Sequence, residues 1–210
     1  MENTSILSLA LELRDLSCIR GQRVLFRGLN VAVAAGKALS VEGPNGAGKT
    51  SLLRMIAGFL RPAAGEIRVR TKGGEIADAE ERGKFVGWFG HQDAVKPQLS
   101  VREQLEFWAR LYRSAQSPGG VIEAFGLSSL AELPGQYLSA GQKRRLAFAR
   151  LQLCSRPLWL LDEPLAALDA AGKVLVANAV AAHCASGGIV LAATHEALGI
   201  ECDKLLLGAR

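Results

Sequence analysis

The sequence predicts an α/β fold in which a mostly parallel sheet is covered by helices on both faces. Three short apolar segments, LWLL (158–161), GGIVLAAT (187–194) and KLLLG (204–208), read as strands, and a helical stretch near 170–186 separates the first two. A glycine-rich loop at 43–50 separates a strand pattern from a helix pattern, and residues 93–156 show helix patterns without strands. Apolar strands that alternate with helices are typical of parallel strands buried on both faces.

The first 90 residues alternate short β-like segments with turns. We expect strands at LALEL (9–13), RVLF (23–26), LNVAV (29–33), KALSVE (37–42), GEIRVR (65–70) and KFVGWFG (84–90). After the glycine-rich loop, a helix is predicted to begin at Thr50. Leu52, Ile56 and Leu60 recur there with helical spacing, and Gly58 marks its end.

Residues 93–156 are predicted to form an inserted helical subdomain. Ser100 and Glu103 make a capping box that opens its first helix. The run Pro118-Gly119-Gly120 is expected to end that helix, and VIEAFGL (121–127) to form a second, short one. The run LSAGQ (138–142) then opens a basic helix rich in alanine and leucine.

Size and composition indicate a globular chain with a substantial core. Its 210 residues suit one domain with an inserted lobe, and 49% hydrophobic residues argue against disorder. The formal net charge of +5 suits a phosphate-bearing ligand, but the basic residues are too dispersed to predict nucleic-acid binding. For the one basic cluster, Lys143–Arg145, we expect a solvated helix face rather than a binding patch.

The cysteines and the apolar runs predict neither a metal site nor a membrane span. Cys18, Cys154, Cys184 and Cys202 have no CxxC spacing, so we expect small core residues in a reducing cytoplasm. Residues 174–195 lack Asp, Glu, Lys and Arg, but Gly187-Gly188 interrupts them. We therefore expect a helix followed by a buried strand. No secretory signal is expected at the start of the sequence.

The segment GPNGAGKT matches the phosphate-binding pattern GxxxxGK[ST] between a strand and a helix. Its glycines allow backbone N–H groups to approach phosphate oxygens. Lys49 is expected to reach the β- and γ-phosphates, and Thr50 to offer its hydroxyl to Mg²⁺. The predicted nucleotide-binding residues of this loop are Gly43, Pro44, Asn45, Gly46, Ala47, Gly48, Lys49, Thr50 and Ser51.

Polar residues follow three of the predicted strands. Asp162 and Glu163 come directly after LWLL, at the sheet edge where open α/β proteins bind ligands. We expect Asp162 to hold Mg²⁺ and Glu163 to accept a proton from the water that attacks the γ-phosphate. Gln92 is predicted to contact the metal or that water, and His195 to hydrogen-bond the γ-phosphate.

Besides GPNGAGKT, the predicted helix start at LSAGQ also has the features of a phosphate-binding site, although one nucleotide needs only one such site. We therefore expect Ser139, Gly141 and Gln142 to serve the nucleotide of another copy of the chain. Two copies related by a twofold axis would enclose two ATP molecules, and hydrolysis would open the pair. Asp169, which follows in LAALD, is expected to reach that interface.

The order of GPNGAGKT, Gln92, LSAGQ, LWLLDEP, LAALD and His195 resembles the ATP-binding cassette (ABC) nucleotide-binding domain over the whole chain. The resemblance implies an ABC-type ATPase: a P-loop NTPase with a mostly parallel core, an N-terminal antiparallel β subdomain and an inserted helical subdomain. It implies one domain over 1–210, with its core at 1–92 and 157–210 and the helical part at 93–156. Arg20 stands where the family usually stacks an aromatic residue on adenine, and a guanidinium can stack in its place.

The sequence between the motifs, as in GHQDAVKPQLSVREQLEFW, is similar to that of the ATP-binding subunits of bacterial haem exporters of cytochrome c maturation. This resemblance implies ATP and Mg²⁺ as cofactors and an ATP-dependent homodimer. It also implies the integral membrane subunit of a haem exporter and associated haem-handling membrane proteins as partners, at the cytoplasmic face of the inner membrane. The alternatives are a subunit of another transporter, for lipid, drug or ion, and a soluble P-loop phosphotransferase.

Overall fold

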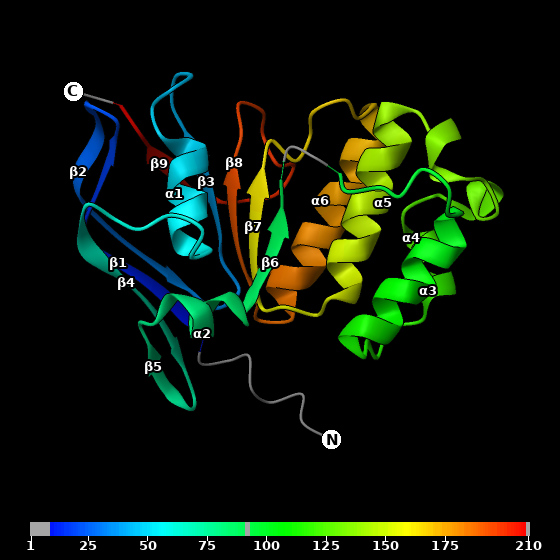
Figure 1. Ribbon diagram of the computed structural model, residues 1–210, viewed down its shortest axis with the longest axis horizontal. Coiled ribbons are helices and arrows are strands. Elements are labelled where there is room, and N and C mark those ends of the chain that lie inside the picture. Colours follow the sequence, from blue (N-terminus) through cyan, green and yellow to red (C-terminus); the bar gives the residue numbers. More distant parts are fainter. Residues whose placement is uncertain (1–8, 91–92, 209–210) are drawn as a thin grey trace.

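The computed structural model describes residues 9–90 and 93–208, which form two sheets and a group of helices (Figure 1). One sheet is antiparallel, with strand order β2-β1-β4-β5, and the other is parallel, with order β6-β7-β8-β3-β9. The predicted α/β class and mostly parallel core are therefore confirmed. The antiparallel sheet comes from the N-terminal third of the chain, as the resemblance implies.

The strands of the antiparallel sheet are β1 (Ala10–Arg20), β2 (Arg23–Ala34), β4 (Ala64–Thr71) and β5 (Gly74–Ile76). Those of the parallel sheet are β3 (Ala38–Glu42), β6 (Val86–Phe89), β7 (Leu158–Asp162), β8 (Ile189–Ala193) and β9 (Asp203–Leu206). The helices are α1 (Lys49–Ile56), α2 (Ala79–Gly83), α3 (Val101–Tyr112), α4 (Pro118–Ala124), α5 (Ala140–Leu153) and α6 (Ala170–Ala185).

Strands β7 and β8 of the parallel sheet are buried on both faces, which explains why they read as apolar runs. In β7, Leu158 and Leu160 face a core shared with α1 and the antiparallel sheet. Trp159 and Leu161 face the opposite core, shared with α5 and α6. Successive side chains of a strand point to opposite faces, so each face receives every second residue. Helix α1 is therefore enclosed between the two sheets.

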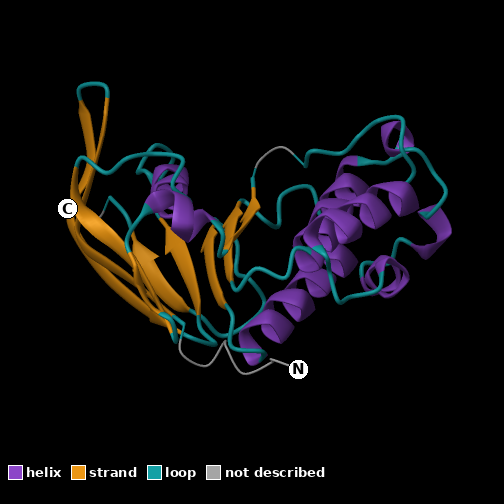
Figure 2. Cartoon of the chain, turned by 60° about the horizontal axis from the view of Figure 1, so that its bottom comes forward, coloured by secondary structure: helices purple, strands orange, loops and turns teal. Residues whose placement is uncertain are grey.

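The helices of residues 101–153 lie on the side of the parallel sheet away from the antiparallel one (Figure 2). Helix α5 contacts α3, α4, α6 and strand β6, so it joins the helical region to the sheet. Its aromatic contact is Phe148 against Phe89 of β6, with ring centroids 4.0 Å apart. The predicted capping box at Ser100 is present, and Ser139 with Gln142 forms a second one that was not predicted.

Several local predictions differ from the structure. Residues 23–34 form one strand, β2, because the expected turn near Gly28 (φ +63°) is only an irregularity in its pairing with β1. Pro118 begins α4 instead of ending the preceding helix, which already stops at Tyr112. Proline suits the first turn of a helix because its missing N–H has no partner there anyway. Strand β5 and helix α2 were not predicted.

The long uncharged run folds as expected, into α6 and then β8. Among residues 9–90 and 93–208, no helix is long and apolar enough to cross a membrane. Cys18 is buried in the core, and Cys154, Cys184 and Cys202 are half-buried at its edge. Burial raises the pKa of all four thiols, which favours their neutral form.

Candidate functional site

The glycine-rich loop follows β3 and leads into α1 at the carboxyl edge of the parallel sheet, where β7 and β8 also end (Figure 1). Gly48 caps α1 with a left-handed backbone (φ +104°). A Cβ atom at Gly48 would lie 3.1 Å from the ring of Phe26, so both the conformation and the space require glycine. Residues 43–51 thus present a helix N-terminus at the edge where the predicted catalytic residues also lie.

Lys49 is buried, and its ammonium group lies among the predicted site residues. Its Nζ donates a hydrogen bond of 2.7 Å to the carbonyl oxygen of Gly43 and lies 2.9 Å from Nε2 of His195. The same Nε2 lies 3.1 Å from Oδ1 of Asn45. The structure therefore brings Lys49, Asn45 and His195 together, although His195 is about 150 residues away in the chain. A cation in this loop is well placed for phosphate oxygens.

Thr50 and Asp162 also meet. The Thr50 hydroxyl donates a hydrogen bond of 2.9 Å to Oδ1 of Asp162, which is buried at the end of β7. A hydroxyl beside a carboxylate is an oxygen donor set of the kind that suits Mg²⁺, which is usually held by one or two protein ligands together with phosphates. The described residues contain no group of three or more His, Cys, Asp or Glu that would hold a metal alone. The pair therefore fits a metal brought with a nucleotide.

Glu163 follows Asp162 and turns away from the strand. Its carboxylate Oε1 lies 3.6 Å from Nε2 of His195, and both side chains are partly exposed. Its backbone is left-handed (φ +48°), which is unusual for a residue other than glycine. The N–H of Glu163 donates to the carbonyl of Ala193 in β8 at 2.8 Å. An accessible carboxylate next to the phosphate loop has the placement that a general base for water requires.

The second predicted phosphate site lies on the same edge of the molecule, with the ends of β7 and β8 between it and the loop before α1 (Figure 1). The Ser139 hydroxyl accepts a bond of 3.2 Å from the N–H of Gln142, whose side chain accepts one of 2.8 Å from the N–H of Ser139. Ser139 is exposed. No hydrogen bond between described residues joins this helix start to the loop of residues 43–50.

The start of α5 is packed against the loop that follows Glu163. A Cβ atom on Gly141 would lie 2.9 Å from the carbonyl oxygen of Ala167, so glycine is required by space. Asp169, at the end of this loop, accepts a bond of 2.8 Å from the N–H of Gly172 and so caps α6. The interface role expected for Asp169 stays a prediction.

Two predicted site residues remain, Gln92 and Arg20. Gln92 lies outside the described residues. Arg20 is exposed near the turn between β1 and β2, where it stands opposite Arg23 in the strand register. Arg23 and Phe26 of β2 were not predicted, yet Arg23 extends to Gly46 and Phe26 packs on Gly48. Their approach to the loop depends on the pairing of β1 with β2 and on the packing of that sheet against α1, so no local motif identifies them.

The expectation of a solvated face at Lys143–Arg145 is wrong for Arg144. This side chain is only 4% exposed. Its guanidinium donates to the carbonyl of Gly90 (3.0 Å), to Oδ1 of Asp93 (3.0 Å), and to the carbonyls of Asp162 (3.1 Å) and Glu163. A buried arginine needs partners of this kind, since an unpaired buried charge is costly. Arg144 therefore joins α5 to the ends of β6 and β7.

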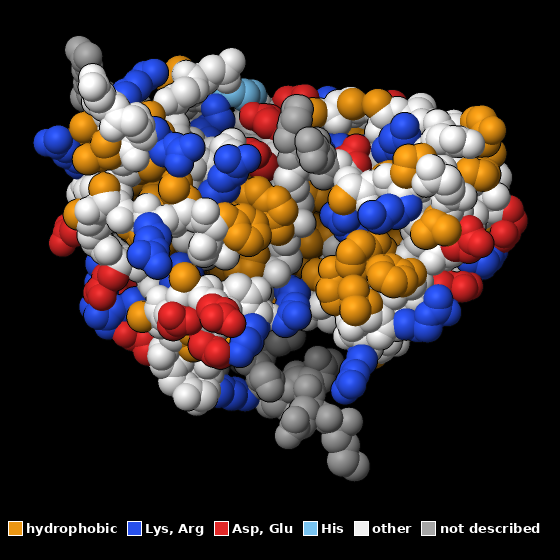
Figure 3. All heavy atoms as spheres, viewed as in Figure 1, with side chains coloured by type: hydrophobic (Ala, Val, Ile, Leu, Met, Phe, Trp, Pro, Cys, Tyr) orange, Lys and Arg blue, Asp and Glu red, His pale blue; other side chains and the backbone are white. Residues whose placement is uncertain are grey.

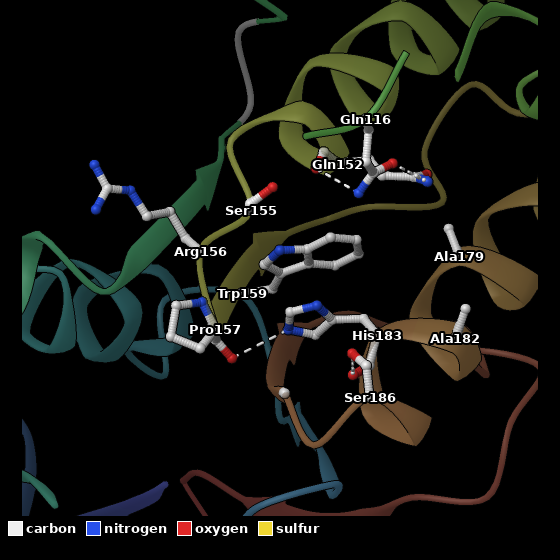
Figure 4. Close-up of a pocket in the computed structure, with 11 residues that line it drawn as sticks. Gln116, Gln152, Ser155, Arg156, Pro157, Trp159, Ala179, Ala182, His183 and Ser186 are labelled. Carbon is white, nitrogen blue, oxygen red and sulfur yellow. Dashed lines mark hydrogen bonds between the residues drawn. The ribbon is translucent and has the colours of Figure 1, made fainter. Parts of the chain in front are cut away.

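A separate cavity of about 380 Å³ lies beyond the amino ends of β7 and β8, away from these residues (Figure 4). The rings of Trp159 and His183 stack there with centroids 4.0 Å apart. Nε2 of His183 lies 3.1 Å from the carbonyl oxygen of Pro157, and burial lowers the pKa of His183 to about 4. None of the predicted site residues lines this cavity.

The sequence and fold were compared with known proteins. A family model described as ABC transporter matches residues 26–166. The chain is 49% identical, over 197 residues, to the cytochrome c biogenesis ATP-binding export protein CcmA of Rhodopseudomonas palustris (strain HaA2), covering 93% of this chain and 96% of that protein. It is 46% identical, over 184 residues, to the protein of the same name from Hyphomonas neptunium (strain ATCC 15444), covering 88% and 89%.

Solved structures give the same fold. A putative ABC transporter ATP-binding protein from Pyrococcus furiosus superimposes with a TM-score of 0.78 at 24% identity, covering 94% of this chain and 97% of that one. The ADP conformation of MJ1267, an ATP-binding cassette of an ABC transporter, gives a TM-score of 0.76 at 20% identity and covers 95% and 87%. Together with the family match, these findings show that the chain belongs to the ABC transporter family, as an ATP-binding subunit.

Proposed function

We propose that this chain is the ATP-hydrolysing subunit of a membrane complex for cytochrome c biogenesis, and that it couples hydrolysis to haem export or to release of a haem-loaded chaperone. The ATPase part is supported above all by the convergence of Lys49, Glu163 and His195 at one sheet edge, from three distant parts of the chain. The cytochrome c part is supported by 49% identity to a protein named for that process.

The phosphate chain of ATP would lie along residues 43–50. Lys49 would exchange its bond to the Gly43 carbonyl for the β- and γ-phosphates, and the loop N–H groups would donate to their oxygens. Thr50 and Asp162, with Gln92, would hold Mg²⁺ through their oxygens. When bound, Mg²⁺ neutralises part of the phosphate charge and aligns the γ-phosphate. Arg20 would lie against the adenine.

Hydrolysis would use the carboxylate of Glu163. The oxygen of a water attacks the γ-phosphorus while the bond from that phosphorus to the β–γ bridging oxygen breaks, and Glu163 accepts the water proton. His195, 3.6 Å from Glu163 and 2.9 Å from Lys49, would donate a hydrogen bond to the γ-phosphate. Inorganic phosphate and ADP are the products.

A second copy of the chain would complete each site. Ser139, Gly141 and Gln142 lie at the N-terminus of α5, where Ser139 is exposed and the helix dipole favours a phosphate group, so they would meet the nucleotide of a partner copy. Loss of the γ-phosphate would remove the shared ligand and release the pair. The division into a core (1–92 and 157–210) and a helical subdomain (93–156) is proposed together with this motion.

The proposed partners are an integral membrane subunit of a haem exporter and its associated haem-handling proteins, with this chain at the cytoplasmic face of the bacterial inner membrane. Apolar side chains gather on the face shown in Figure 3. The exposed ones in the structure include Phe59 after α1 and Phe107 and Leu111 of α3. Contiguous exposed apolar patches are typical of surfaces that bind another protein, so these side chains are candidates for the contact with the membrane subunit.

The cytochrome c role is tested in a bacterial strain that lacks its own cytochrome c biogenesis ATP-binding protein. Expression of this chain should restore haem-stained c-type cytochromes in the membrane fraction. The Lys49→Met variant, at equal protein level, should not. If the wild-type chain hydrolyses ATP in that strain but leaves the cytochromes absent, the role belongs to another transporter, and mass spectrometry of the membrane proteins that co-purify with the chain would identify which one.

A further inference from the structure

Arg144 connects three segments that are far apart in the chain. It lies on α5, five residues after Ser139, and its two terminal nitrogens donate to both strand ends beside the site. One nitrogen bonds the carbonyl of Gly90 and the carboxylate of Asp93, on either side of Gln92, at 3.0 Å each. The other bonds the carbonyls of Asp162 (3.1 Å) and Glu163. The guanidinium carbon lies 4.3 Å from the ring centroid of Phe89.

The carbonyl group of Glu163 that accepts from Arg144 belongs to a residue with an unusual backbone conformation. Glu163 has a left-handed conformation (φ +48°), which costs energy for any residue with a Cβ atom. Such a conformation persists only where the surroundings hold it. The surroundings here are the carbonyl of Ala193, which accepts from the N–H of Glu163, and Arg144, which donates to its carbonyl oxygen.

The same helix carries the residues proposed to meet the partner's nucleotide. Ser139 caps α5, and Gly141 in its first turn packs directly on Ala167 of the loop after Glu163. A displacement of the start of α5 would therefore move the guanidinium that holds Glu163. The neighbouring basic residue has no such link: Arg145 donates to the carbonyls of Phe125 and Gly126, in the helical region.

We propose that Arg144 is a positioning residue for ATP hydrolysis, which holds the backbone of Glu163 in its active conformation and couples it to α5. Binding of the partner's nucleotide at Ser139 would fix α5, and through Arg144 would fix Glu163. The inference rests on the proposed roles of Glu163 and Ser139. Arg144 itself, buried behind the strand ends, touches no substrate.

The test compares Arg144→Lys with Arg145→Lys in the full-length chain. Lysine keeps the positive charge beside Asp93, but as a point donor it cannot bond both strand ends as the planar guanidinium does. We expect Arg144→Lys to lower kcat by about 100-fold, the effect of a catalytic group displaced by roughly 1 Å. Its KM and its affinity for a fluorescent nonhydrolysable ATP analogue should change less than about threefold. Arg145→Lys should keep kcat within about threefold of wild type.

A purely structural role gives a different pattern. If Arg144 only neutralises Asp93, lysine rescues hydrolysis, and a kcat within about threefold of wild type overturns the proposal. A loss of nucleotide affinity that parallels the loss of kcat overturns it too. Circular dichroism and thermal melting report whether the variant is folded. If it is not, the double variant Arg144→Met with Asp93→Asn, which leaves no unpaired buried charge, should show the same selective loss of kcat.

The Glu163→Gln background separates this inference from the proposed function. If Arg144 acts through Glu163, Arg144→Lys should reduce the residual hydrolysis of Glu163→Gln by less than about twofold, because residues that act as a unit are not additive. A full additional loss would show that Arg144 acts elsewhere, and would overturn the inference while leaving Glu163 in its role. If Glu163→Gln alone keeps wild-type kcat, the proposed role of Glu163 fails, and this inference fails with it.

Discussion

The two helix starts that the sequence marks as phosphate sites differ in how their own chain surrounds them. The loop before α1 is enclosed: Lys49 is bonded to Gly43 and lies against His195, and Thr50 is bonded to Asp162. The start of α5 is exposed, and Ser139 and Gln142 bond mainly to each other. Both have the backbone N–H groups and dipole that attract phosphate. Among the described residues, side chains of the loop before α1 contact the side chains of His195 and Asp162, whereas α5 reaches Glu163 through Arg144, at its backbone carbonyl.

One chain should therefore suffice to bind nucleotide, whereas hydrolysis should also require the exposed helix start of a second copy. The enclosed loop should bind ATP in an isolated chain. The exposed helix start should contribute only when a second copy presents a nucleotide to it. Variants of the two regions should therefore separate nucleotide affinity from turnover.

Glu163→Gln tests the step at which the two regions act together. Glutamine keeps the size of the side chain but cannot accept the proton of the attacking water, so kcat should fall by about 1,000-fold, within the range for a lost general base. ATP binding should persist, and size-exclusion chromatography with light scattering should show an ATP-dependent dimer. A variant that still turns over ATP as wild type does would remove Glu163 from its role.

Ser139→Asp tests whether the exposed helix start meets phosphate. Aspartate caps a helix as well as serine does, so stability should be unchanged, but it places a negative charge where the partner's γ-phosphate is expected. Hydrolysis and ATP-dependent dimerisation should fall by about 100-fold, comparable to the loss of one oxyanion donor. Ser139→Asn, a neutral cap, is the matched control and should lose much less. Equal activities of the two variants would place the phosphate elsewhere.

Lys49→Met tests the enclosed loop. It removes the ammonium group, and a charged hydrogen bond is worth about 1.5–3 kcal/mol, so the affinity of the isolated chain for an ATP analogue should fall by about 10- to 100-fold. Ser139→Asp should leave this same affinity unchanged. Isothermal titration calorimetry on both variants measures the contrast. Equal losses of affinity would show that the two regions are not separate.

Arg20→Ala tests the adenine contact and should have the smallest effect. Stacking of a guanidinium at an exposed site is worth about 0.5–1 kcal/mol, so ATP affinity should fall by about two- to fivefold. Because the contact is to the base, affinity for inorganic triphosphate should stay the same. If both affinities fall together, Arg20 contributes through its charge and not through stacking on the base.

Much of the site was predictable because its chemistry lies in short, contiguous motifs. GPNGAGKT places Lys49 and Thr50 by local geometry, and LWLLDEP places Asp162 and Glu163 at a strand end. His195 was expected after the last apolar strand, because parallel strands share one carboxyl edge, but its contacts with Lys49 and Glu163 were seen only in the structure. Arg23 and Phe26 escaped prediction, because their approach to the loop depends on how β1 pairs with β2 and how that sheet packs on α1.

The α/β class, the phosphate loop, the acidic pair after β7 and the start of α5 could all be predicted, because each depends on residues that are neighbours in the chain. The burial of Arg144 became visible only in the folded chain. Its charge and its place in a basic run predicted an exposed side chain. The segments at the ends of β6 and β7 provide four hydrogen-bond acceptors for its guanidinium next to α5. Burial of a charge is decided by partners distant in sequence, which no local pattern contains.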